Sequence, residues 1–238
     1  MAARSAGELL LRRFGGPARG VERKSSSTDM VSDADREAED AIVAVLGRER
    51  PDDGLLGEEG AAAPGSSGRR WVVDPLDGTT NFLYGIPQWA VSVALEGSVG
   101  VVFDPVRDEL FSAEQGDGAS LNGMALKMRE GVPLERALVA TGFSYDAGMR
   151  ARQADVAARL LPAVRDVRRA GAAALDLAWL AAGRLDGYYE RGLKPWDWAA
   201  GRLLVVEAGG VVEELGGEPV GLVAGSAPLV RELAPLVD

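Results

Sequence analysis

Two aspartates, Asp74 and Asp77, follow directly after the short apolar run at residues 71–73. The run predicts a buried strand, and Pro75 with Asp77-Gly78 predicts a turn at its end. We therefore expect the strand to stop at Asp74 and the turn to bring Asp77 back beside it. Two neighbouring carboxylates repel each other, and a cation between them relieves that repulsion. Such oxygen ligands suit Mg²⁺ or Mn²⁺ better than Zn²⁺.

The residues after this pair favour phosphate binding. Gly78, Thr79 and Thr80 provide small side chains and hydroxyls where a short helix could begin. The free N–H groups at the start of a helix bind phosphate. Metal ligands beside such an anion site indicate phosphoryl chemistry. An ordinary surface turn is the alternative, because Asp-Pro and Asp-Gly are common in turns.

Four other acidic side chains lie at or near the ends of expected elements. Glu58 ends the apolar run at residues 55–57, one loop before Asp74, and is a third candidate ligand. Asp35 lies in the first turn of an expected helix, and Glu190 ends an expected strand. Asp197 precedes Trp198, where its alternative role is to cap the helix that follows.

Composition excludes several kinds of chemistry. The chain has no Cys and no His, which excludes disulfides, thiol catalysis, Ser-His-Asp triads and His-ligated Zn or Fe sites. The net charge of −10 argues against non-specific binding to nucleic acid or anionic lipid. No apolar run is long enough to span a membrane, and residues 1–13 lack the apolar core of a signal peptide. We expect a cytoplasmic protein.

The elements that must position these residues alternate between helices and strands, which predicts a layered α+β fold. The strands close together in sequence predict an antiparallel meander, followed by a turn at 116–122. Residues 61–68, rich in Gly, Ala and Ser, are expected to form a loop. Strands are expected at 71–73, 89–95, 99–103, 109–114, 138–141, 186–190, 211–214 and 222–224. Helices are expected at 9–14, from 32–35 through 46, at 153–161, 172–182, 198–208 and 228–237.

Four motifs in this order resemble those of the inositol monophosphatase family. They are Asp29-Met30-Val31-Ser32-Asp33-Ala34-Asp35, Gly57-Glu58-Glu59, Asp74-Pro75-Leu76-Asp77-Gly78-Thr79-Thr80-Asn81-Phe82, and Trp196-Asp197 followed by Ala200-Gly201 and Glu207-Ala208-Gly209-Gly210. The resemblance runs from Lys24 to the C-terminus. It implies a layered αβαβα sandwich, a single catalytic domain over 1–238 with halves at 1–130 and 131–238, and a homodimer.

The resemblance also implies a set of metal ligands for two to three Mg²⁺ ions, with Mn²⁺ as a substitute. One ion would bind Glu58, Asp74 and the carbonyl of Leu76. A second would be shared by Asp74, Asp77 and Asp197. A weaker third would rest on Glu58 and waters. Sensitivity to lithium is implied by the same family.

Catalytic and phosphate-binding roles follow from the resemblance too. Asp35 and Thr79 would lie behind Glu58 and help to activate the attacking water. The backbone N–H groups of Gly78 and Thr79 would bind phosphate. Lys24 occupies the place of a loop lysine near the site.

The substrate pocket departs from the family pattern at one position. Glu190 and Asp197 would contact the substrate, and Gly171 and Ala172 would line the alcohol pocket. Many relatives have Ser or Thr where this chain has Ala172, so one side-chain contact is lost. The segment before Lys24 is short and the loop between Glu58 and Asp74 is compact, which could weaken the third metal.

Inositol 1-phosphate, or a similar small polyol phosphate, is the expected substrate. Histidinol phosphate, fructose 1,6-bisphosphate and adenosine 3′,5′-bisphosphate are alternatives in the same superfamily, and Thr80-Asn81-Phe82 favours the inositol type. A regulatory interaction protein that keeps the site is the alternative of another class, because some family members bind transcription machinery.

Overall fold

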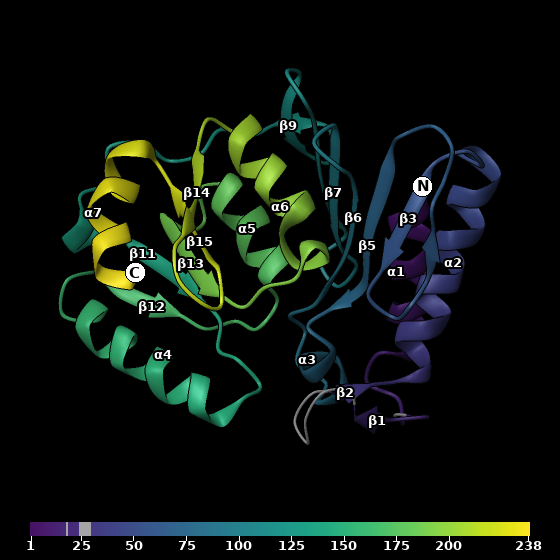
Figure 1. Cartoon of the computed structure of the whole chain (residues 1–238), viewed down its shortest axis with the longest axis horizontal. Helices are drawn as coiled ribbons and strands as arrows, with labels where there is room; N and C mark the ends of the chain where they lie inside the picture. The colour runs from purple at the N-terminus through teal and green to yellow at the C-terminus, as the bar shows by residue number, and fades with distance from the viewer. Residues whose placement is uncertain (18, 24–29) are drawn as a thin grey trace.

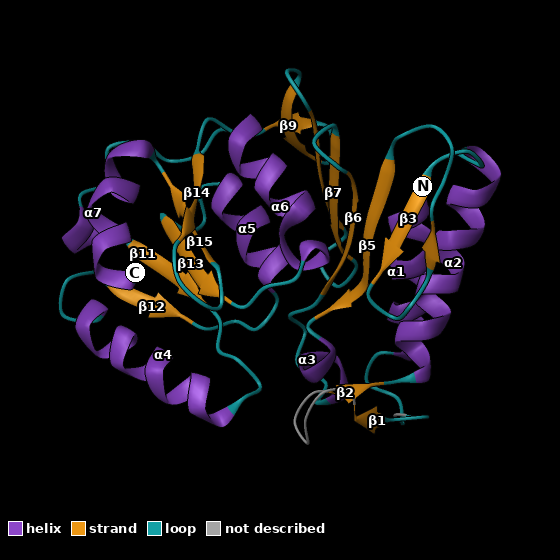
Figure 2. Cartoon of the chain, in the orientation of Figure 1, coloured by secondary structure: helices purple, strands orange, loops and turns teal. Residues whose placement is uncertain are grey.

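The computed structural model describes residues 1–17, 19–23 and 30–238. Across these residues, helices and sheets alternate in five layers (Figure 1). Helices α1 and α2 cover one side of a large sheet, α5 and α6 lie between that sheet and a smaller one, and α4 and α7 cover the far side (Figure 2). The predicted αβαβα sandwich is confirmed.

The large sheet is built around the strand that carries the aspartates. Its described strands run in the order β10-β9-β8-β7-β6-β5-β3-β4, and β5 to β10 form the predicted antiparallel meander. Strand β3 pairs parallel to β5. The strands are β3 (Gly54–Gly57), β4 (Ala62–Ala63), β5 (Arg70–Asp77), β6 (Ala90–Leu95), β7 (Val99–Asp104), β8 (Glu109–Glu114), β9 (Gly118–Leu121) and β10 (Met124–Ala125).

Strand β5 continues beyond Asp74, so the prediction that it stops there is wrong. Its pairing with β6 is interrupted between Asp74 and Asp77 and resumes where Asp77 faces Ala90. A bulge tolerates Pro75, which has no N–H to donate to a neighbouring strand. The two aspartates therefore lie on either side of a bulge in one strand instead of on a strand and a turn.

The smaller sheet mixes parallel and antiparallel pairing. In the described chain its order is β12-β11-β13-β15-β14, with β11 parallel to both β12 and β13. Leu160 from α4 and Leu229 and Leu233 from α7 pack in the core on its outer side. Its elements are β11 (Leu138–Thr141), β12 (Asp166–Arg168), β13 (Gly187–Arg191), β14 (Val211–Leu215), β15 (Gly221–Gly225), α4 (Ala147–Leu160) and α7 (Ala227–Val237).

The middle layer joins the two sheets through small residues. Helices α5 (Ala173–Ala181) and α6 (Pro195–Glu207) pack against each other and against strands of both sheets. A Cβ placed on Gly201 of α6 would lie 2.5 Å from Leu177 Cβ of α5. A Cβ placed on Gly100 of β7 would lie 2.7 Å from the carbonyl oxygen of Ala200. The middle layer therefore depends on glycine at both contacts.

The outer layer on the large sheet contains the helix that Ser32 caps. Helix α1 (Ala2–Arg13) packs on α2 (Asp33–Glu49), and α2 also contacts β5. Phe14, Phe82 and Trp89 form a group of tilted and edge-to-face rings between α1, the short helix α3 (Thr79–Leu83) and the start of β6. This aromatic group ties α3, which follows the aspartates, to the outer helices.

Some predicted elements are corrected by the structure. Residues 116–122 were expected to be a turn, but they contain β9, and the expected loop at 61–68 contains β4. Helices α1 and α4 begin earlier than their apolar spacing indicated, at Ala2 and Ala147. The short elements are β1 (Glu22–Arg23), β2 (Met30–Val31) and the 3₁₀ turn Leu134–Arg136. Among the described helices, none has both the length and the apolar character needed to cross a membrane.

The close packing of α5 on α6 can be tested with alanine. Gly201→Ala should lower the free energy of unfolding by about 1–3 kcal/mol, because the added methyl overpacks against Leu177. Gly47→Ala on α2 is the matched control, since a Cβ there meets nothing within 4 Å. It should raise stability by up to about 1 kcal/mol through helix propensity. Urea unfolding measures both, and a stabilising Gly201→Ala would contradict the packing described here.

Candidate active site

The bulge in β5 buries two carboxylates. Asp74 is 2% exposed and Asp77 is 8% exposed. Asp74 Oδ1 accepts a hydrogen bond from the N–H of Leu76 at 3.0 Å. Because this bond closes across Pro75, the bulge itself fixes the orientation of the Asp74 carboxylate.

Asp77 is held by the N-terminus of α5. Its carboxylate accepts hydrogen bonds from the N–H groups of Ala173 at 3.1 Å, Ala174 at 2.8 Å and Leu175 at 3.4 Å. The unpaired N–H groups at the start of a helix and the helix dipole both favour a negative charge there. This contact joins the strand of the large sheet to the middle layer.

Glu58 follows β3, which pairs parallel to β5. The N–H of Glu58 donates to the carbonyl of Val73 at 3.1 Å, so Glu58 lies next to Asp74. The buried carboxylate of Glu39 on α2 accepts from the N–H groups of Glu59 and Ala61 at 2.9 and 2.8 Å. Glu39 thereby fixes the loop that presents Glu58.

Asp35 and Thr79 connect α2 to α3. Asp35 is 1% exposed, and its Oδ2 accepts from both the N–H and the hydroxyl of Ser32, at 2.8 and 2.6 Å. Its Oδ1 accepts from Thr79 Oγ1 at 2.8 Å. The Thr79 hydroxyl also lies 3.1 Å from the carbonyl oxygen of Leu76. The Thr79 hydroxyl therefore lies between Asp35, in the first turn of α2, and Leu76 of β5.

Gly78 forms the turn between β5 and α3. Its φ is +93°, in the left-handed region that favours glycine. A Cβ there would lie 2.9 Å from the carbonyl oxygen of Gln88 and 3.3 Å from Ala172 Cβ. The turn thus needs glycine for its conformation and for the close approach of the Ala172 segment.

Asp197 and Glu190 come from the second half of the chain. Asp197 is the third residue of α6, which begins at Pro195, so it does not precede the helix as expected; its Oδ2 accepts from Lys194 N–H at 2.6 Å. Glu190 lies near the end of β13 and accepts from Tyr188 Oη at 2.8 Å. Both side chains line a cavity of about 120 Å³ with Asp77, Gly78, Gly171 and Ala172.

The acidic groups around this cavity repel one another. Burial raises the pKa of Asp74 well above its usual range, and the charges of Glu58, Asp77 and Asp197 raise it further. Burial raises the pKa of Asp77 to about 7 against the N–H groups of Ala174 and Leu175, which lower it. Burial likewise raises the pKa of Asp197 to about 8, with Asp77 and Glu58 adding to the effect.

Such a group of carboxylates fits a hard divalent cation. The donors are carboxylate oxygens and the Leu76 carbonyl, which suit Mg²⁺ or Mn²⁺, and a cation would remove the repulsion that raises these pKa values. With the side chains in their present positions, no three or more acidic groups among the described residues lie close enough together to hold a metal ion. Metal binding by Glu58, Asp74, Asp77 and Asp197 therefore stays a prediction. Lys24 lies outside the described residues.

Two charged groups that the sequence analysis did not single out lie at or near this cavity. Asp176, an acid in the Ala-rich helix α5, is buried, which raises its pKa well above the usual range, as do the charges of Glu190 and Asp77. Its position as the lone acid of that helix was the signal available in the sequence. Arg169 lines the same cavity as Glu190; no spacing rule distinguishes it from Arg168.

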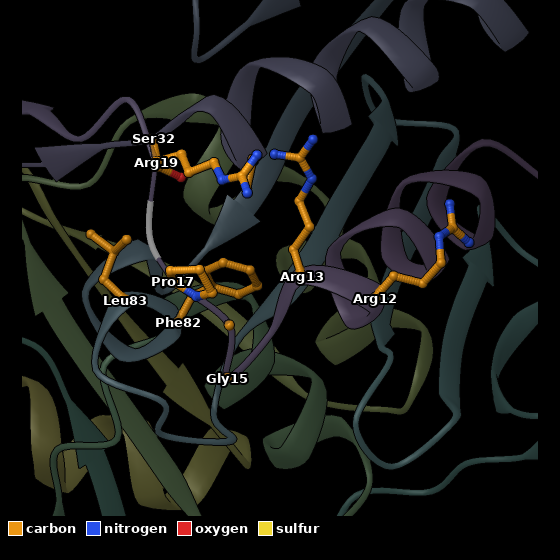
Figure 3. A pocket seen from close by; sticks show the side chains of 10 residues that line it. Arg12, Arg13, Gly15, Pro17, Arg19, Ser32, Phe82 and Leu83 are labelled. Atoms are coloured by element: carbon orange, nitrogen blue, oxygen red, sulfur yellow. The ribbon is translucent and has the colours of Figure 1, made fainter.

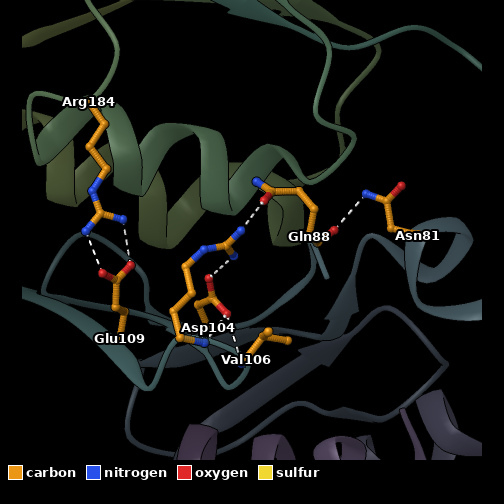
Figure 4. Close-up of polar contacts among 7 residues, drawn as sticks. Asn81, Gln88, Asp104, Val106, Glu109 and Arg184 are labelled. Atoms are coloured by element: carbon orange, nitrogen blue, oxygen red, sulfur yellow. Dashed lines mark hydrogen bonds and ion pairs between the residues drawn. The ribbon is translucent and has the colours of Figure 1, made fainter. Parts of the chain in front are cut away.

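Asn81 fixes the wall of the cavity. Its Nδ2 donates to the carbonyl of Gln88 at 2.7 Å and to that of Ala170 at 2.8 Å. Arg107 in turn bonds the Gln88 side chain and the buried Asp104 (Figure 4). This network attaches the segment before Gly171 to the large sheet.

A larger cavity of about 280 Å³ lies between the end of α1, the start of α2 and α3 (Figure 3). It is lined by Arg13, Arg19, Ser32 and Phe82 among others, and its described lining contains no carboxylate. Arg12 points away from it, and Arg13 pairs with Glu37. The smaller cavity is the candidate active site, because Asp77, Glu190 and Asp197 line it.

Comparison with known proteins identifies the family of this chain. The sequence pattern of the inositol monophosphatase family matches residues 1–234. The Nus factor SuhB of Escherichia coli K12 is 42% identical, over 91% of this chain and 83% of that protein. An inositol-1-monophosphatase of Mesorhizobium japonicum is 43% identical, over 99% of this chain and 93% of that protein.

A solved structure agrees with these sequence matches. The crystal structure of extragenic suppressor protein suhB from Bartonella henselae superposes with a TM-score of 0.93 at 40% identity, covering 100% of this chain and 95% of that one. The chain belongs to the inositol monophosphatase family.

Two adjacent threonines test the role of the bridging hydroxyl. Thr79→Val removes the donor to Asp35 and should lower the free energy of unfolding by about 1–3 kcal/mol. Thr80→Val is the matched control, because in the described chain Thr80 Oγ1 is buried without a hydrogen-bond partner. It should leave stability unchanged or higher. Thermal melts of both variants decide this, and equal losses would refute the bridge.

Proposed function

We propose that this chain is a Mg²⁺-dependent phosphomonoesterase that hydrolyses inositol 1-phosphate or a similar small polyol phosphate. The observation that carries the proposal is the burial of Asp74 and Asp77 beside Glu58 and Asp197, with pKa values raised by burial and mutual repulsion. Buried charges persist when they are paired or bind metals, so this arrangement is typical of a cation site. Family membership supplies the class of reaction.

Two to three Mg²⁺ ions, or Mn²⁺ in their place, would be held by Glu58, Asp74, the carbonyl of Leu76, Asp77 and Asp197. When bound, such ions acidify a water molecule and neutralise charge on the phosphate and on the leaving oxygen. The proposed third ion, on Glu58, would be the weakest. The same carboxylates must lose their protons for this role, which their raised pKa values oppose in the absence of a cation.

Thr79 and Asp35 are proposed to position the attacking water and receive its proton. The Thr79 hydroxyl donates to Asp35, which leaves an oxygen lone pair free to accept from water. Asp35 is fixed by Ser32 and cannot turn away. The backbone N–H groups of Gly78 and Thr79 are proposed to bind phosphate oxygens, since no side chain can occupy the turn at Gly78.

The alcohol part of the substrate is proposed to lie against Glu190, Gly171 and Ala172. Glu190 is a hydrogen-bond acceptor for ring hydroxyls, and its carboxylate is already oriented by Tyr188. A cavity of about 120 Å³ suits a small alcohol. Histidinol phosphate, fructose 1,6-bisphosphate and adenosine 3′,5′-bisphosphate are the substrates to be compared.

A second candidate function is regulatory interaction, because relatives at 42% identity carry the name Nus factor SuhB. The chain would then keep the acidic site in addition to a regulatory role. For this chain we propose a homodimer in the cytoplasm that acts on a small molecule and binds neither nucleic acid nor membrane. The lithium sensitivity implied by the family is part of the same proposal.

Release of phosphate with Mg²⁺ tests the enzymatic proposal. Asp74→Asn should lower kcat by far more than tenfold, because Asp74 is assigned to two metal sites and a positioned metal contributes several kcal/mol to catalysis. Asp117→Asn, which changes an exposed aspartate in a turn, is the control and should match the wild type. The panel should contain inositol 1-phosphate and the three alternatives. Retention of more than about a tenth of kcat in Asp74→Asn would make the metal assignment wrong.

A further inference from the structure

The described lining of the candidate active-site cavity contains one charged side chain that the proposed function does not yet use. Among the described residues that line it, Arg169 is the one basic residue, facing a cavity that also presents Asp77, Glu190 and Asp197. A guanidinium stays charged throughout the physiological range and can only donate hydrogen bonds. Its chemistry is therefore complementary to the carboxylates on the same walls.

Arg169 differs from its neighbour in having no partner among the residues that the structure describes. Arg168 donates to the carboxylate of Asp166 and to the carbonyl of Val167. Within the described chain the structure assigns no hydrogen bond, ion pair or ring contact to the Arg169 guanidinium. Arg168 ends β12, and successive side chains of an extended segment point in opposite directions. Arg168 is thus turned away to Asp166, while Arg169 is directed to the cavity.

The backbone beneath Arg169 is fixed. Asn81 Nδ2 holds the carbonyl of Ala170 at 2.8 Å. A Cβ on Gly171 would lie 2.5 Å from Arg169 Nη1, so the guanidinium lies directly over Gly171. Ala172, next along the same wall, contributes no polar side-chain group. Arg169 therefore places a charged hydrogen-bond donor in the lining that also contains Glu190.

Arg169 and Glu190 interact without closing on each other. Burial raises the pKa of Glu190 to about 7, and the charge of Arg169 is one of the influences that keep it from rising further. Both line the same cavity, yet they form no ion pair, so their charged atoms are more than 4.0 Å apart. Opposite charges that face one cavity without contact leave space for a ligand group between them.

We propose that Arg169 and Glu190 form a donor–acceptor pair that binds two hydroxyl groups on the alcohol part of a polyol phosphate. The inference rests on the proposed phosphatase function. A hydroxyl can donate to Glu190 while a neighbouring hydroxyl accepts from Arg169, so a diol satisfies both side chains at once. An ester whose alcohol part lacks such hydroxyls satisfies neither.

Steady-state kinetics on inositol 1-phosphate and p-nitrophenyl phosphate test whether Arg169 and Glu190 bind hydroxyl groups. Arg169→Gln should raise KM for inositol 1-phosphate about tenfold or more, the loss expected for a charge-assisted hydrogen bond, with kcat changed less than about twofold. The same variant should hydrolyse p-nitrophenyl phosphate like the wild type. Arg169→Lys should restore part of the loss, since it keeps the charge without the planar fork. Arg168→Gln removes the same charge one residue away and should behave as the wild type.

Several outcomes would contradict the proposal that Arg169 and Glu190 bind two hydroxyl groups. An equal rise in KM for both esters would place Arg169 at the phosphate group, and an unchanged KM for inositol 1-phosphate would exclude a contact. Arg168→Gln with the same loss as Arg169→Gln would indicate a general effect of surface charge. Thermal melts check that each variant is folded.

A binding measurement separates this inference from the proposed function. If the wild type hydrolyses neither ester with Mg²⁺, the phosphatase proposal fails. Calorimetric binding of inositol 1-phosphate then tests whether Arg169 and Glu190 contact the ligand. Weaker binding to Arg169→Gln than to Arg168→Gln supports it, and equal binding, or none to the wild type, refutes it.

Discussion

The burial of Asp74 and Asp77 on either side of a bulge in β5 is the constraint on which the site depends. Two charges removed from water need compensation, and the fold supplies part of it. Leu76 N–H binds Asp74, and the N-terminus of α5 binds Asp77. The compensation is incomplete, because Glu58 and Asp197 add charge of the same sign. This remaining repulsion is what makes the site suited to a divalent cation.

The same contact of Asp77 with α5 unites the two halves of the chain. Asp77 belongs to the large sheet, whereas the helix that binds it leads into β13 and Glu190. Close packing at Gly100 and Gly201 brings α6, and with it Asp197, against the large sheet. Asp77 and Gly78 from one half and Glu190 and Asp197 from the other thus line one cavity. The division into halves at residue 130 stays a prediction.

Sequence reasoning predicted the layered fold, the meander and the juxtaposition of acids, because apolar runs and turn residues are local signals. It placed the end of β5 at Asp74, since a bulge that lets Pro75 remain in a strand depends on pairing with β6. It treated Asp197 as a cap before the helix, but α6 begins at Pro195, a favoured first helical residue. The different directions of Arg168 and Arg169 could not be predicted, because they depend on where β12 ends.

Thermal melting with and without metal tests the central claim. The pKa values of Asp77 and Asp197, about 7 and 8 in the fold, exceed the unfolded value of about 4. The folded chain thus holds more protons, and its metal-free stability should fall as pH rises through that interval.

With EDTA, Tm should be lower at pH 8 than at pH 5.5, and Asp74→Asn should flatten this trend while Asp117→Asn should not. Saturating Mg²⁺ binds the ionised carboxylates, so it should raise Tm more at pH 8 than at pH 5.5. A metal-free Tm that does not fall with pH, together with no shift on adding Mg²⁺, would contradict the account.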